Sequence, residues 1–152
     1  MNGAHLHLIL CHLPIMGAGF TILLILFSLF KKSKDLKQVS LWFAVITGAS
    51  ALAVYLTGDS AEEVVKNLLG TPESLIETHE TFALYFLIAL LCIGAIALAG
   101  LFLSQASTKI LHKFVWIVFI LTLLSSFLAI ETGLTGGKIR HTEIENTQTI
   151  KK

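Results

Sequence analysis

Residues 8–30, LILCHLPIMGAGFTILLILFSLF, decide the fold of this chain because they form a long apolar segment without an acidic or basic side chain apart from one histidine. A helix rises 1.5 Å per residue, so about 20 such residues cross the roughly 30 Å hydrocarbon core of a bilayer. Three further segments have the same character: residues 40–57, 82–103 and 114–131. With 55% hydrophobic and 14% charged residues, the 152-residue chain is too apolar for a soluble domain of this length.

These four segments predict an all-α membrane protein, a four-helix bundle that runs up, down, up and down. Backbone polar groups in lipid must be satisfied within the segment, and long continuous apolar runs lack the alternation of a membrane strand barrel. We expect one membrane domain at residues 1–136 and a polar C-terminal tail at residues 137–152. In the loop between the second and third spans, Ser60 and a glutamate three residues later predict a short amphipathic helix over residues 60–69.

Charged residues divide the loops into a basic set and an acidic set. The loops after the first and third spans are rich in lysine, whereas residues 58–78, between the second and third spans, carry five acids and one lysine. Basic loops face the cytoplasm. We therefore expect an integral protein of the bacterial inner membrane with both termini in the periplasm. The net charge of +1 and the lack of a continuous basic patch argue against nucleic-acid binding.

Histidines gather at one end of this predicted bundle. Threading the spans back and forth brings five of the six to the face of the acidic loop: His5, His7, His12, His79 and His141. Histidine is costly to place at a membrane edge and titrates near neutral pH, so such a cluster indicates a function. The spacing within the first span lacks the i, i+4 clamp of a single-helix metal site, so ligands would come from different helices.

A weak internal repeat supports this arrangement. The first and third spans begin near His12 and His79, and the second and fourth end in Thr57-Gly58 and Thr132-Gly133. This pattern favours two copies of a helical hairpin.

A b-type haem is the first hypothesis for what the histidines hold, with His12 and His79 as the two ligands of the iron. Gly17 would let the flat ring approach the backbone, and Lys138 or Arg140 would pair with a propionate. His7 and His141 would be a second ligand pair or support the first. Three acids would accept the second N–H of the imidazoles: Asp59, Glu80 and Glu131. A covalent c-type haem is excluded because no Cys-x-x-Cys-His motif occurs.

Two alternatives stay open. A bare zinc, copper or iron ion could be bound by four histidines: His7, His12, His79 and His141. The cluster could instead act without a cofactor as a proton relay or pH-sensing latch.

Four motifs resemble an uncharacterised four-span membrane family, the domain of unknown function DUF2231. They are LHLILCHLPI, TGDS, ETHETFA and GGKIRHTE, in this order along nearly the whole chain. The resemblance picks out the following positions: His7, His12, Pro14, Thr57, Gly58, Asp59, His79, Gly136, Gly137 and His141. Leu8 and Leu13 stand where the family has proline and phenylalanine. Some members of that family are fused to c-type cytochrome domains, so the resemblance implies a role in respiratory electron transfer.

We therefore expect a membrane electron carrier that passes electrons between a quinol, or other subunits of a membrane redox complex, and an external acceptor such as a c-type cytochrome. An enzyme is not expected, because no nucleophile beside a base, no catalytic carboxylate pair and no phosphate-binding loop is found. A structural or assembly subunit of a membrane complex is the alternative, since small residues in the spans favour close helix packing.

Overall fold

The computed structural model describes the backbone of residues 3–69 and 71–140. In this part of the chain every regular element is helical: α1 (Gly3–Leu10), α2 (His12–Phe30), α3 (Lys34–Tyr55), α4 (Gly58–Leu69), α5 (Glu73–Leu103), the short 3-10 helix η1 (Ser104–Ala106) and α6 (Thr108–Arg140). Four helical stretches are long and apolar enough to cross a membrane: Gly3–Phe30, Lys34–Asn67, Glu73–Leu103 and Thr108–Ile139. The predicted all-α fold with four such helices is confirmed, and the chain is an integral membrane protein.

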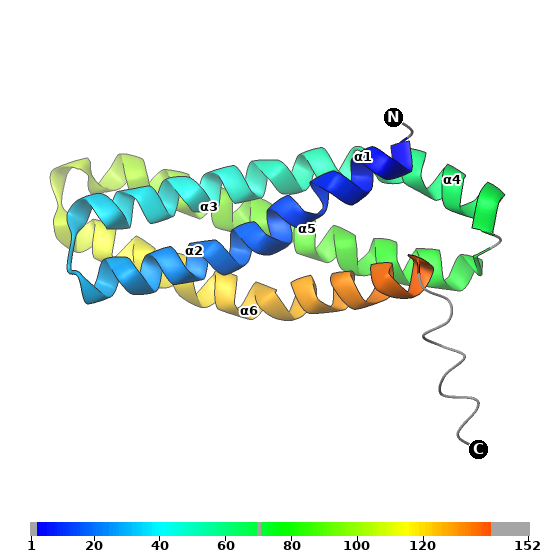
Figure 1. The fold of residues 1–152 in the computed structure, drawn as a ribbon. Helices are drawn as coiled ribbons and strands as arrows, with labels where there is room; N and C mark the ends of the chain where they lie inside the picture. Colours follow the sequence, from blue (N-terminus) through cyan, green and yellow to red (C-terminus); the bar gives the residue numbers. More distant parts are fainter. Residues whose placement is uncertain (1–2, 70, 141–152) are drawn as a thin grey trace, which may run out of the picture.

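The break between α1 and α2 follows from Pro14. A proline inside a helix lacks the N–H that would bond to the carbonyl four residues earlier, and its ring clashes with that carbonyl. The carbonyl four residues before Pro14 belongs to Leu10, which is where α1 ends. The chain resumes as α2 at His12, so both histidine-bearing segments lie almost end to end (Figure 1).

The helices extend beyond the apolar segments that predict them. α5 begins at Glu73, so the polar turns before the apolar run of residues 82–103 belong to the same helix and His79 lies in its first turns, as expected. α6 continues to Arg140, so the helical part runs past residue 136, where the tail was expected to begin. α4 covers the expected helix at residues 60–69 but begins earlier, at Gly58.

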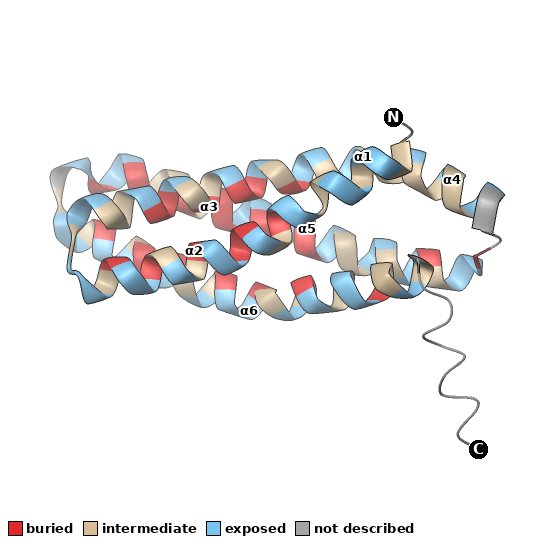
Figure 2. Ribbon diagram, in the orientation of Figure 1, coloured by how far each residue is buried: buried red, intermediate tan, exposed pale blue. Residues whose placement is uncertain are grey.

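The long helices pack closely because glycines face neighbouring backbones. A Cβ added to Gly48 on α3 would lie 2.7 Å from the carbonyl oxygen of Leu90 on α5, and the Cα of Gly94 lies 3.6 Å from the same point. Small residues permit this approach, which drives helix association in lipid. The buried positions lie mainly on the inward sides of the helices (Figure 2). Buried hydroxyls within the long helices bond to carbonyls of their own helix, as Thr122 does to the Val118 carbonyl at 2.7 Å.

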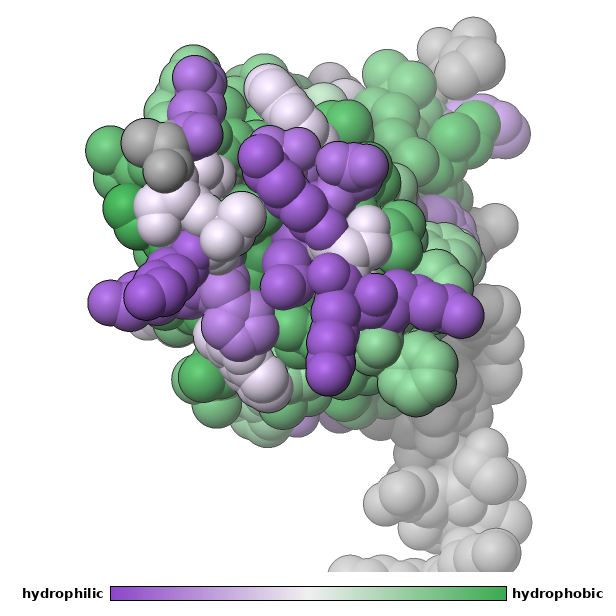
Figure 3. Space-filling model, turned by 90° about the vertical axis from the view of Figure 1, so that its left-hand side faces the viewer, coloured by the Kyte–Doolittle hydropathy of each residue, from purple (hydrophilic) through white to green (hydrophobic). Residues whose placement is uncertain are grey.

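The two ends of the bundle differ in chemistry. One end, which we call the lysine end, holds the α2–α3 connection at residues 31–33 and η1 with its flanks at residues 104–107 (Figure 1). Viewed from that end, hydrophilic side chains cap the bundle and hydrophobic ones surround them (Figure 3). The other end, the histidine end, is formed by α1, α4, the first turns of α5 and the last turns of α6 (Figure 1).

Candidate functional site

A large cavity lies at the histidine end. Its volume is about 1090 Å³, and its walls come from α1, α2, the end of α3, α4, the first turns of α5 and the last turns of α6. Most of the lining is apolar, and three histidines line it: His7, His12 and His79. Sites for small molecules and cofactors are typically apolar hollows of about 300–1,000 Å³ with a few polar groups, so this cavity has the size and character of a cofactor site.

His7, on α1, is held by a threonine just beyond the end of α3. Its Nδ1 lies 3.0 Å from Thr57 Oγ1. The Thr57 hydroxyl donates its single proton to the Val54 carbonyl at 2.6 Å, so toward His7 it can only accept. Nδ1 of His7 therefore carries the proton, and in the neutral ring Nε2 is left as an unprotonated acceptor or ligand atom.

His79, on α5, is held in the same way by α6. Its Nδ1 lies 3.2 Å from Thr135 Oγ1. The Thr135 hydroxyl donates to the Glu131 carbonyl at 2.7 Å and approaches the Thr132 carbonyl at 3.1 Å, so it too accepts from the histidine. Nε2 of His79 is again the unprotonated atom of a neutral ring.

The two histidine–threonine pairs are equivalent. In each pair the threonine hydroxyl also bonds to the carbonyl three residues before it, Val54 for Thr57 at 2.6 Å and Thr132 for Thr135 at 3.1 Å. Both rings line one cavity, and they are close enough to interact electrostatically. The arrangement therefore presents two imidazoles with the same tautomer, each from a different helical hairpin.

This equivalence corrects the repeat expected from the sequence. The matching positions are His7 and His79, not His12 and His79, and the matching tripeptides are residues 56–58 and 134–136, both Leu-Thr-Gly. The expected match used Thr132-Gly133, but Thr132 bonds to the Leu128 carbonyl of its own helix. It is Thr135 that reaches the histidine of the neighbouring helix.

Gly136 makes room for the ring of His79. A Cβ at Gly136 would lie 3.0 Å from His79 Cε1 and 3.3 Å from Nδ1, which is tighter than an ordinary contact. The glycine that the family resemblance picks out therefore has a steric role beside the histidine.

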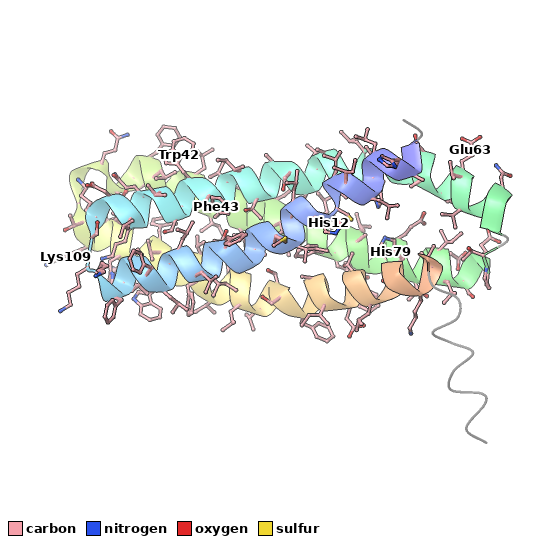
Figure 4. The ribbon with its side chains drawn as sticks, in the orientation of Figure 1. His12, Trp42, Phe43, Glu63, His79 and Lys109 are labelled. Atoms are coloured by element: carbon pink, nitrogen blue, oxygen red, sulfur yellow. The ribbon has the colours of Figure 1, made fainter. Side chains whose placement is uncertain are left out.

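His12 shares the cavity but is held differently. Its Nδ1 lies 2.9 Å from the Leu8 carbonyl, which can only accept, so Nδ1–H is again the donor. The acceptor is only four residues earlier in the chain, on the adjoining α1, and the side chain is exposed. Figure 4 shows His12 near the α1–α2 junction and His79 on α5, in the same half of the bundle. His7 is thus the closer counterpart of His79.

The expected acidic residues divide between two places. Asp59 and Glu80 line the cavity, together with Glu62 and Glu77. Glu131 is not among the lining residues and contributes its backbone carbonyl to Thr135. The hydrogen-bond partners of Nδ1 in His7 and His79 are therefore threonine hydroxyls. The repeated Leu-Thr-Gly was the signal in the sequence that could have identified Thr135.

Other expected site residues lie elsewhere or outside the described part. Gly17 is buried against α3, where an added Cβ would lie 2.7 Å from Thr47 Oγ1, so it serves helix packing rather than the cavity wall. Arg140 is the last residue of α6, and its side chain lies outside the described part of the chain. His141 also lies outside the described residues.

A compact metal centre is not formed by the residues that the structure describes. Among residues 3–69 and 71–140, no group of three or more histidine, cysteine, aspartate or glutamate side chains could hold a metal ion. A bare ion bound by four histidines would need His141, which lies outside this part.

Comparisons with protein-family models, with curated proteins and with solved structures found no match to this chain.

Proposed function

We propose that this chain is a membrane-bound b-type haem protein that carries electrons, with His7 and His79 binding the iron through Nε2. One observation carries the proposal: two equivalent histidine–threonine pairs leave Nε2 of both rings unprotonated within one cavity of about 1090 Å³. Two neutral imidazoles from different helices are the ligands that a six-coordinate haem iron needs, and bundle cores are built to supply them.

The residues around the cavity have the chemistry needed to bind the iron of a haem group. When bound, haem supplies reversible one-electron chemistry. Thr57 and Thr135 orient the two rings. Each threonine oxygen accepts a hydrogen bond from Nδ1–H, which makes Nε2 of that ring a better electron donor. The apolar walls keep water away from the rings, which lowers the local dielectric constant and influences the reduction potential.

The two propionates of haem are negatively charged and need a basic side chain beside them. No lysine or arginine is among the described residues that line the cavity, whereas four acids are. We assign this role to Arg140 at the end of α6, one of the two basic residues that the sequence offers there.

The proposal includes a placement in the membrane. The chain crosses the bacterial inner membrane up, down, up and down, with the lysine end in the cytoplasm and both termini, the cavity and the surface helix α4 on the periplasmic side. The separation of the lysine end from the acidic α4 supports this orientation. Electrons would pass between a quinol or a larger membrane redox complex and a c-type cytochrome, and the chain would be a member of DUF2231.

An absorption spectrum tests the proposal directly. The full chain, produced with an adequate haem supply and purified in mild detergent, should show a Soret band that shifts on dithionite reduction, with iron present in a fixed ratio to protein. A colourless preparation that contains no iron and does not take up added haem would overturn the proposal. A structural or assembly subunit would then be the better interpretation.

Threonine variants test the tautomer argument. We expect Thr57→Val or Thr135→Val to weaken haem binding about 10–100-fold, because the ring loses the acceptor that orients it. Thr122→Val is the matched control, since this buried hydroxyl bonds only to its own helix in the described structure. Haem titration followed at the Soret band measures the affinities. Equal losses in Thr135→Val and Thr122→Val would contradict the role given to the threonines.

A further inference from the structure

A second, smaller groove lies at the lysine end, away from the histidine cavity. Its volume is about 510 Å³, and it runs between the first turns of α3 and the end of α5 with η1. Three polar side chains line it, Asp35, Gln38 and Gln105, next to apolar ones that include Val39, Trp42 and Phe102.

The polar and apolar residues are separated along the groove. On α3, Asp35, Val39 and Trp42 follow one another at helical spacing, so they share one face with the acid nearest the helix start. On the facing segment, Phe102 lies in the last turn of α5 and Gln105 in η1 beyond it. The polar groups are therefore nearest the end of the bundle and the apolar groups nearer its middle, which is the pattern that an amphiphile would match.

The apolar part of the groove is open toward the surroundings. Trp42 is 51% exposed and Phe102 is 64% exposed. Figure 4 shows Trp42 near the lysine end, far from Glu63 on α4. Tryptophan is enriched at the level of the lipid headgroups, so this groove lies where a headgroup and the start of an acyl chain would meet the protein.

Asp35 is the one charged residue among those that line the groove. Asp35 is the only acid at the lysine end within the described residues, and it is flanked on α3 by Lys34 and Lys37. Both ion pairs found in the described part of the chain involve Lys66, at the opposite end. Asp35 is therefore an exposed carboxylate without an ion-pair partner there, set among lysines.

We propose that this groove binds a phospholipid with a primary ammonium headgroup, phosphatidylethanolamine. The ammonium donates hydrogen bonds to the Asp35 carboxylate and to the side-chain carbonyls of Gln38 and Gln105. The phosphate lies toward Lys34, and an acyl chain follows the apolar side chains. A choline headgroup has no N–H to donate, and an anionic lipid offers no cation to Asp35, so charge and hydrogen bonding together favour the ethanolamine lipid. This inference does not depend on the haem proposal.

Native mass spectrometry of the full chain, delipidated in detergent and given lipids of identical acyl chains, tests the inference. We expect the ethanolamine lipid to be retained about threefold or more over the choline lipid, as one or two net hydrogen bonds would give. Retention should fall stepwise through the N-methyl and N,N-dimethyl lipids as N–H donors are removed. This series needs no variant, so it cannot be confused with misfolding.

Charge-removing variants locate the lipid. Asp35→Asn removes the negative charge that pairs with the ammonium and should clearly reduce the preference for the ethanolamine lipid. Glu63→Gln, which removes one exposed carboxylate at the opposite end, should leave the preference unchanged. Equal retention of both lipids by the unmodified chain, stronger retention of phosphatidylglycerol than of the ethanolamine lipid, or a preference of unchanged size in Asp35→Asn would each overturn the inference.

Discussion

Replacement of either His7 or His79 by alanine is expected to abolish stable six-coordinate haem binding, the largest effect that any single substitution at the site should produce. Each variant removes one of two Nε2 atoms that the threonine hydroxyls leave unprotonated. The remaining histidine can supply only one axial ligand, so the spectrum should lose its low-spin, bis-histidine form. Absorption spectra of oxidised and reduced protein, with iron content, measure the result.

The His12→Ala variant decides between two ligand assignments. The sequence pattern matches His12 with His79. In the structure His7 and His79 are the matching pair, because each is hydrogen-bonded to a threonine of a neighbouring segment. If His7 and His79 bind the iron, His12→Ala retains a bis-histidine spectrum and His7→Ala does not. The reverse outcome would reject His7 as a ligand and restore the pair expected from the sequence.

His112→Ala serves as the control for removing a histidine. This residue lies at the lysine end, where its Nε2 accepts a hydrogen bond from Trp116 Nε1 at 3.2 Å. Its replacement should leave haem content and spectrum unchanged. A loss of haem in this variant as large as in His7→Ala would show that the effect is one of general instability.

The second large effect concerns the contact between α3 and α5. Gly48→Ala should lower the free energy of unfolding by about 1–3 kcal/mol relative to Gly94→Ala, because the new methyl group meets a backbone carbonyl that cannot move aside easily. The Cβ would lie 2.7 Å from the Leu90 oxygen at Gly48, but 3.7 Å from its nearest neighbours at Gly94. Both substitutions gain the same intrinsic helix propensity, about 1 kcal/mol, so the comparison cancels it.

Unfolding by SDS titration in mixed micelles, followed by far-ultraviolet circular dichroism, measures this difference. Gly19→Ala adds a reference, since no atom lies within 4 Å of its added Cβ. Equal stability of the Gly48 and Gly94 variants would show that the two helices separate without cost at this point.

The histidine site could be predicted from the sequence only in part. Topology alone brings His7, His12 and His79 to one end of the bundle, and all three do line the same cavity. Their hydrogen-bond partners could not be predicted, because whether a ring meets a threonine depends on the rotation and depth of two neighbouring helices. Gly17 illustrates the same limit: its small size predicts close approach, but the structure shows that Thr47, not a cofactor, is the neighbour.

The sequence by itself determined the four apolar helices, the break before His12 and the contrast between a lysine-rich and a histidine-rich end. These features are local: the length of an apolar run, the missing N–H of Pro14 and the charge of each loop act within a few residues. Only the tertiary structure decided that His7 and His79 are equivalent and that Thr57 and Thr135 set their tautomers. Each residue turns the helix by about 100°, so small differences in how two helices pack determine which side chains meet.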